Sequence, residues 1–279
     1  MTEIKDLLHF NETVAGFRRR NGKVVSNCFL MPDEITKLSS EGKLFTVEGS
    51  GWLLIISDST DYSNLYYYTT EDSDTEEAKK LIAQAGDRDL FIDIVTKNSR
   101  GDKATPAKLI EAGIAEPYKN YVRLQQFIKD MDFDKYDATL AEGYYWAEDY
   151  DNYDEAMKLW KLGLDEKSTP LPTKESFLKH KEDGSILFIV DKDNNLAAVY
   201  VISISGNQSL LQHLCVSPEH RRKRLGDSMI YKSFHYSRDK GVKKFIFWAF
   251  EDNIPILNLM KRFGFVEDGT LCEQLIVKK

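Results

Sequence analysis

Extended and helical stretches follow one another in the same order in the two halves of this 279-residue chain. In the first half, runs rich in β-branched and aromatic residues predict strands, and stretches with apolar residues at helical spacing predict helices. The expected strands are 52–57, 65–70, 91–95 and 121–125, and the expected helices are 75–85 and 106–112. The order is therefore strand, strand, helix, strand, helix, strand.

The second half repeats this order with a clearer pattern, after two further helices and one further strand. Its expected strands are 185–190, 196–205, 210–216, 245–250 and 271–277, and its expected helices are 153–164, 173–181, 222–240 and 253–263. Strands that alternate with helices predict an α/β fold, with a central sheet flanked by helices. A length of 279 residues fits two domains. We therefore expect two tandem domains, 1–129 and 130–279.

Composition limits the class of protein further. Hydrophobic residues make up 42% of the chain, enough for a buried core. The three cysteines, Cys28, Cys215 and Cys272, are scattered and suggest neither a disulfide framework nor a metal site, which favours a reducing compartment. No apolar run approaches the ~18 residues that would span a bilayer. We expect a cytoplasmic protein without a membrane partner or a bound metal.

The charge is concentrated in one segment. The chain has 45 acidic and 38 basic residues, a net charge of −7. The segment 130–155 contains ten acidic residues and Lys135 as its single base. Because nucleic-acid binding usually requires a wide basic face, we expect no nucleic-acid partner.

The segment 214–230 has the clearest functional pattern. A strand ends at Val216, Pro218 stops its pairing, and a helix begins within 221–226. The start of a helix leaves backbone N–H groups unpaired and carries the positive end of the helix dipole. This segment therefore predicts an anion site suited to a diphosphate, and three arginines and a lysine at 221–224 add positive charge.

The pattern Val216-x-Pro218-x-x-Arg221-x-x-x-x-Gly226, followed by Asn253 and by Gly264-Phe265, resembles the GCN5-related N-acetyltransferases (GNAT). The resemblance covers about residues 140–279. It implies a GNAT-like mixed central sheet flanked by helices, with acetyl-CoA as co-substrate. It also implies direct transfer of the acetyl group, in a ternary complex, to a primary amine of a small molecule or peptide.

The resemblance also implies which residues bind acetyl-CoA. In the family, the loop at the helix start binds the pyrophosphate through its amides, and the strand before it pairs with the pantetheine arm. An asparagine at the start of the next helix often contacts the same arm. In this chain, the corresponding residues are Leu214, Cys215, Val216, Arg221, Arg222, Lys223, Arg224, Leu225, Gly226, Asp227 and Asn253.

Two residues depart from the family pattern. Arg224 stands where the family has the first glycine of the loop, and Met260 stands where it often has a tyrosine that protonates the leaving thiolate. Methionine cannot donate a proton. These departures keep a second interpretation open, in which the chain is a non-catalytic binding or regulatory protein that binds CoA without turnover.

The general base and the acceptor site are predicted from residue type and from the places that the resemblance implies for them, the strand before the loop and the tract where the family's first strand and first helix border the acceptor cleft. The candidates for the base are Gln212 through an oriented water, His213 and Glu251, although a lone histidine on a strand is more often a packed residue. Tyr144, Trp146, Glu148 and Asp149 belong to an acidic and aromatic tract that suits a cationic amine. The same tract also fits a solvated, acidic helix start.

The first half resembles the second in element order but has no basic loop. After the strand 65–70 comes the acidic run 71–77, which would repel a diphosphate. We therefore expect a degenerate GNAT-like domain without cofactor, with a separate small α/β domain as the alternative. The run Arg18–Arg20, followed by Asn21-Gly22, predicts an exposed basic turn.

Overall fold

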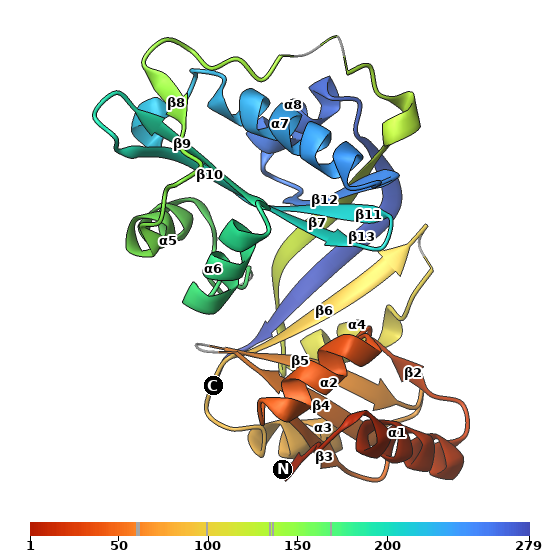
Figure 1. Cartoon of the computed structure of the whole chain (residues 1–279). Coiled ribbons are helices and arrows are strands. Elements are labelled where there is room, and N and C mark those ends of the chain that lie inside the picture. Colours follow the sequence, from red (N-terminus) through yellow and green to blue (C-terminus); the bar gives the residue numbers. More distant parts are fainter. Residues whose placement is uncertain (60–61, 99, 134, 136, 168) are drawn as a thin grey trace. The chain divides into compact units, whose positions relative to one another are not determined.

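The computed structural model describes residues 1–59, 62–98, 100–133, 135, 137–167 and 169–279 (Figure 1). Asp134, one of the acids of the segment 130–155, lies outside the described residues. The chain forms two compact units. The N-terminal unit contains residues 1–121 and 269–279, and the C-terminal unit contains residues 122–268.

In its described residues, the N-terminal unit combines a mixed sheet with four helices. Its helices are α1 (Leu7–Asn21), α2 (Pro32–Ser40), α3 (Thr75–Ala83) and α4 (Ala104–Glu111). Its strands are β1 (Thr2–Glu3), β2 (Val25–Ser26), β3 (Leu44–Glu48), β4 (Trp52–Asp58), β5 (Ser63–Thr69), β6 (Leu90–Lys97) and the first part of β7 (Glu116–Phe127), joined by the second part of β13 (Val266–Val277). The main strand order is β1-β3-β4-β5-β6-β13, and β2 pairs with β5.

A strand from the far end of the sequence completes the N-terminal unit. Residues 270–277 of β13 pair antiparallel with residues 97–90 of β6. This pairing satisfies the backbone groups along an edge of β6 that would otherwise stay open. The compact units therefore differ from the expected division at residue 129, because the segment 269–279 packs with the first unit.

Helices cover both faces of the sheet in the N-terminal unit. Phe10, Val14 and Phe17 of α1 share one buried cluster with Ile35 of α2 and with residues of β4 and β5. Ala78 and Leu81 of α3 belong to a second cluster with α4, β6 and β13. The sheet is therefore the middle of three layers, as the alternating pattern predicts.

The C-terminal unit has the same layered plan. Its helices are α5 (Tyr153–Gly163), α6 (Lys174–Glu182), α7 (Leu225–Asp239) and α8 (Ile254–Arg262). Its strands are β8 (Tyr144–Trp146), β9 (Ile186–Asp191), β10 (Leu196–Ser205), β11 (Gln208–Val216) and β12 (Lys244–Phe250), in the order β12-β11-β10-β9-β8, together with the second part of β7 and the first residues of β13. Two short 3₁₀ turns, Ile128–Asp130 and Pro218–His220, accompany them. Helices α7 and α8 pack in one core cluster, and α5 and α6 pack in another.

The parallel strands of each unit diverge soon after they meet. In the C-terminal unit, β11 pairs with β12 only through residues 208–210 and 244–246. In the N-terminal unit, β5 pairs with β6 only through residues 63–64 and 90–91. Beyond these short ladders, one edge of β11 and one edge of β5 are available to other partners.

The elements expected in the second half agree with the structure to within a few residues. In the first half, the sequence patterns did not identify α1, α2 and the short strands β1, β2 and β3. The predicted basic turn at Arg18–Arg20 is wrong, because these residues form the last turn of α1 and Gly22, with φ +69°, follows the helix end.

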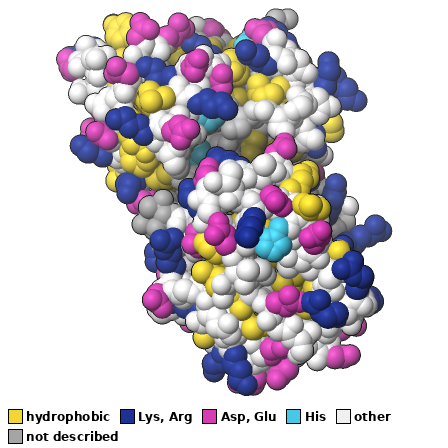
Figure 2. All heavy atoms as spheres, turned by 60° about the horizontal axis from the view of Figure 1, so that its bottom comes forward, with side chains coloured by type: hydrophobic (Ala, Val, Ile, Leu, Met, Phe, Trp, Pro, Cys, Tyr) yellow, Lys and Arg dark blue, Asp and Glu magenta, His cyan; other side chains and the backbone are white. Residues whose placement is uncertain are grey.

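The surface carries mixed charge on the face shown in Figure 2, where basic and acidic side chains are interspersed. Among the helices that the structure describes, none is both long and apolar enough to cross a membrane.

Candidate functional site

A cavity of about 620 Å³ opens in the C-terminal unit where β11 has left β12. Leu214, Cys215 and Val216 form its wall on the β11 side, and residues of α8 form the opposite wall. The start of α7 lies at one end. The cavity therefore combines an open strand edge, an apolar wall and a helix N-terminus.

A β-bulge shapes β11 at the cavity. The register with β10 shifts between Val199 and Val201, and His213 takes φ +53°, which is unusual for a residue of its size. Trp160 of α5 donates its indole N–H to the His213 carbonyl at 3.0 Å. The His213 ring donates from Nε2 to the Pro170 carbonyl at 2.9 Å. Contacts from α5 and the loop after it thus hold the bulge in place.

The loop before α7 has the backbone of an anion site. Arg222 and Arg224 both lie in the left-handed region, with φ +63° and +59°. The first helical bond runs from the Ser228 N–H to the Arg224 carbonyl at 3.1 Å, and the Arg224 side chain does not cap the helix. The amides of residues 225–227 are therefore left without a capping side chain among the described residues. Alternating backbone conformations of this kind form concave N–H sites for anions.

Positive charge dominates this end of the cavity. Arg221 donates from Nε to the Val216 carbonyl at 3.4 Å. Arg262 of α8 pairs with Asp227 at 2.7 Å, which neutralises the carboxylate nearest the helix start. Among the described residues, no carboxylate pairs with Arg222 or Arg224. The site thus has unpaired cations as well as unpaired amides, and both suit a phosphorylated ligand.

Two glycines in the walls of the cavity differ in how closely they are packed. A Cβ at Gly163, the last residue of α5, would lie 2.8 Å from Cys215 Sγ. A Cβ at Gly226 would lie 3.5 Å from Leu259 Cδ2, an ordinary contact. Burial raises the pKa of the Cys215 thiol to about 12, so this cysteine is protonated at neutral pH. These features fit a packed wall and do not support a nucleophile.

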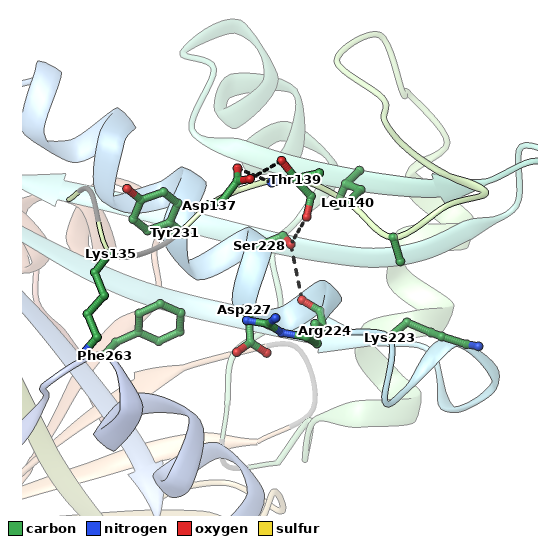
Figure 3. Close-up of a pocket in the computed structure, with 11 residues that line it drawn as sticks. Lys135, Asp137, Thr139, Leu140, Lys223, Arg224, Asp227, Ser228, Tyr231 and Phe263 are labelled. Atoms are coloured by element: carbon green, nitrogen blue, oxygen red, sulfur yellow. Dashed lines mark hydrogen bonds between the residues drawn. The ribbon is translucent and has the colours of Figure 1, made fainter. Parts of the chain in front are cut away.

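Ten of the eleven residues predicted to bind the cofactor line this cavity. The exception is Lys223, which lines a neighbouring cavity of about 410 Å³ with Ser228 and Thr139, and its side chain points away from Asp227 (Figure 3). Asn253 lines the main cavity and also caps α8, because its Oδ1 accepts from the Ile256 N–H at 3.4 Å.

The sequence patterns missed several residues of the cavity wall. They are Gly163, Leu164, His220, Pro255, Ile256, Leu259 and Arg262. The positions on α8 follow the helical spacing from Asn253, so this spacing was the available signal. His220 is held by Tyr144, whose hydroxyl lies 3.0 Å from Nδ1, and by Asp191, whose Oδ2 lies 3.9 Å from Nε2.

The three candidates for the general base are not among the described residues that line the cavity. Gln212 accepts from the Ser203 hydroxyl at 2.8 Å, and Glu251 lies exposed in the turn after β12. The pKa of His213 is lowered, chiefly because burial disfavours its charged form. Its bond to Pro170 places the proton on Nε2, and Nδ1 is buried without a hydrogen-bond partner.

The predicted acceptor residues are divided between two environments. Trp146, Glu148 and Asp149 line a separate cavity of about 760 Å³ beside the turn between β9 and β10, whereas Tyr144 packs against His220. Lys232 of α7 places its ammonium 4.2 Å from the Trp146 ring centroid and 3.5 Å from Glu148 Oε1. A cation of the protein itself therefore occupies the face that was predicted to take a substrate amine.

Comparisons with known proteins agree with this geometry. Residues 139–265 match the model of the acetyltransferase (GNAT) family. This stretch is a GNAT domain. The match begins before β8 and ends after α8, so it includes the cavity, the bulge and the loop at the start of α7. Among curated proteins, no sequence matches the chain.

Solved structures extend the likeness to most of the chain. A GCN5-related N-acetyltransferase from Sphaerobacter thermophilus has a TM-score of 0.55 and 11% identity, over 83% of this chain and 82% of that one. A tandem GNAT protein from the clavulanic acid biosynthesis pathway has a TM-score of 0.54 and 16% identity, over 84% and 83%.

A third structure, a GCN5-related N-acetyltransferase from Kribbella flavida, has a TM-score of 0.54 and 13% identity, and it covers 100% of this chain and 97% of that one. At such identities, the likeness shows the fold alone. The predicted GNAT-like α/β fold in tandem form is thus confirmed.

Proposed function

We propose that the C-terminal unit binds acetyl-CoA in the 620 Å³ cavity and transfers the acetyl group to a primary amine of a small molecule or peptide. The observation that supports this most is the uncapped start of α7, with the unpaired Arg222 and Arg224 beside it. In this proposal, the amides of residues 225–227 bind the pyrophosphate.

The remaining parts of the cavity suit the rest of the cofactor. The open edge of β11 at Leu214–Val216 supplies backbone groups for the amides of the pantetheine arm, and Ile256 and Leu259 cover that arm with apolar surface. The start of α7 at Gly226 packs beside Leu259. The thioester then lies toward the bulge, where Trp160 and Pro170 hold the backbone.

The transfer itself requires one proton acceptor and one proton donor. A neutral amine attacks the thioester carbonyl, the bond from carbon to sulfur breaks, and the amine proton leaves as CoA is released as a thiol. Met260 is fully buried in the core and has no proton to donate. Water is therefore the proton carrier that this proposal assigns to the step.

The buried Met260 also supports a second candidate function, a GNAT-fold protein that binds CoA without turnover. One experiment separates the two. Thiol release is measured with acetyl-CoA and a panel of amines, and CoA binding is measured by calorimetry on the same protein. Amine-dependent thiol release supports the enzyme. Binding without release from any amine supports the second function, and no binding at all contradicts both.

A further inference from the structure

The two units share one order of elements. In the N-terminal unit, the order is β1, α1, α2, β3, β4, β5, α3, β6, α4, and in the C-terminal unit it is β8, α5, α6, β9, β10, β11, α7, β12, α8. The additional element of the N-terminal unit is β2, which lies between α1 and α2. Each part of the C-terminal cavity therefore has an equivalent place in the N-terminal unit.

The open strand edge is covered in the N-terminal unit. Strand β5 leaves β6 after Asn64, just as β11 leaves β12 after Leu210. There β2 pairs antiparallel with β5, and the Ser26 hydroxyl donates to the Tyr67 carbonyl at 2.7 Å. A short peptide of the unit itself thus takes the edge that β11 leaves open in the other unit.

Asn27 bridges the diverging strands. Its Oδ1 accepts from the Tyr67 N–H at 2.7 Å. Its Nδ2 lies 3.3 Å from the Leu65 carbonyl of β5 and 3.1 Å from the Asp93 carbonyl of β6. One side chain therefore satisfies backbone groups of both strands, as an extended ligand between them would do.

Two further places in the N-terminal unit correspond to parts of the C-terminal cavity, and carboxylates occupy both of them. Asp74 caps α3, and its Oδ1 accepts from the Glu76 N–H at 2.9 Å. The Tyr67 hydroxyl of β5 donates at 2.9 Å to Asp102, which also accepts from the first amides of α4. The equivalent places in the C-terminal unit are the uncapped start of α7 and the gap between β11 and α8.

We propose that the N-terminal unit fills its own cofactor groove: β2 and Asn27 replace the extended arm, and Asp74 replaces the phosphate. The chain then takes one acyl-CoA, in the C-terminal unit. The expected stoichiometry of one acyl-CoA per chain rests on the proposed function. The proposal that the groove is filled rests on the contacts within the N-terminal unit.

The first test uses the full chain with CoA as the probe. Calorimetry is expected to give one CoA per chain, and hydrogen exchange with saturating CoA is expected to slow only in peptides from 214–227 and 253–262. Two CoA molecules per chain overturn the proposal, as does slowed exchange in peptides from 63–77. No CoA binding in either unit overturns the proposed function and the count of one.

The second test needs no ligand and decides whether the groove is filled. The Tyr67 amide is expected to exchange slowly in the chain, and Asn27→Ala is expected to speed its exchange at least tenfold. Asn21→Ala is the matched control, because this asparagine bonds to the Phe17 carbonyl within α1. Fast exchange at Tyr67 in the unchanged chain, or equal effects of the two variants, contradicts the filled groove.

Discussion

Helices α3 and α7 follow equivalent strands in the two units, but their first turns have opposite chemistry. Asp74 caps α3, and Glu76 and Glu77 follow in its first turn. Arg224 precedes α7 in a left-handed conformation and leaves its amides uncapped. A carboxylate of the chain satisfies the positive end of the α3 dipole, and an external anion is proposed to do so at α7. The fold is thus common to both units, while the few residues at each helix start differ in charge and in capping.

The largest effect is expected from making α7 resemble α3. Arg224→Asp places a carboxylate at the helix start, where it caps the free amides and repels a diphosphate. We expect CoA affinity to fall about 100-fold, or about 2.7 kcal/mol. Stability is expected to stay equal or rise, because Asp is a better cap and tolerates the left-handed region better than Arg. Calorimetry and thermal unfolding measure the two effects.

Arg224→Gly is the control for this change. Glycine removes the cost of a left-handed side-chain residue, on the order of 1 kcal/mol, and leaves the amides free. CoA binding should therefore survive in Arg224→Gly. If Arg224→Asp binds CoA as well as Arg224→Gly does, the start of α7 is not the phosphate site.

The next largest effect is expected on stability, at a glycine in the first helix of each unit. In α5, Gly163→Ala brings a Cβ to 2.8 Å from Cys215 Sγ, and we expect overpacking to cost about 1–3 kcal/mol. In α1, a Cβ at Gly16 meets only arginine side-chain ends, the nearest at 3.4 Å. Gly16→Ala is therefore expected to stabilise by about 0.5–1 kcal/mol. Urea unfolding of both variants gives the comparison, and equal free energies would contradict close packing at Cys215.

A smaller effect is expected at the capped helix. Asp74→Ala removes the bond to the Glu76 N–H and should lower the free energy of unfolding of the N-terminal unit by about 1 kcal/mol. CoA affinity should not change, because the cavity of the C-terminal unit does not include this residue. Faster hydrogen exchange at the start of α3, with an unchanged CoA isotherm, is the expected result. Weaker CoA binding would place α3 at the ligand and overturn the contrast between the helices.

Mild acid should destabilise the C-terminal unit before the N-terminal unit. Burial lowers the pKa of His213 and His180 in the C-terminal unit, so the unfolded state takes up protons first as the pH falls through 6.5, and this unit loses stability. In the N-terminal unit, burial raises the pKa of Asp93, which acts in the opposite direction, and the lowered pKa of Glu77 costs stability only below its ordinary value of 4.5. When the pH is lowered from 7.5 to 5.5, hydrogen exchange should therefore show that the C-terminal unit opens at a higher pH than the N-terminal unit. His213→Asn should reduce this difference.

The sequence alone predicted most of the fold because its apolar spacing reflects burial directly. The helices of the C-terminal unit and its strands β9 to β12 were placed to within a few residues, whereas the short strand β8 was not identified. The helix expected from residue 222 begins at Leu225, because Arg222 and Arg224 adopt left-handed conformations that side-chain spacing does not reveal. The apolar residues Phe10, Val14 and Phe17 do have helical spacing, so α1 was within reach of the same method.

Pairings between distant residues could not be predicted in this way. The bond from His213 to Pro170, the position of Lys232 over Trp146, and the bridge made by Asn27 each depend on tertiary structure. The loop motif pointed to residues that line one cavity because it lies within one short segment, and its phosphate-binding role stays a prediction. The candidate base and acceptor residues lacked such a local motif, so their roles remain predictions.

The position of β13 has a consequence for synthesis on the ribosome. Residues 270–277 pair with β6, although the whole GNAT domain separates them in the sequence. The sheet of the N-terminal unit therefore stays incomplete until the second unit has been synthesised. This differs from the usual order, in which the domain that is made first is also the first to finish folding. During that interval, the exposed edge of β6 is a place where nascent chains can aggregate and where a chaperone is most useful.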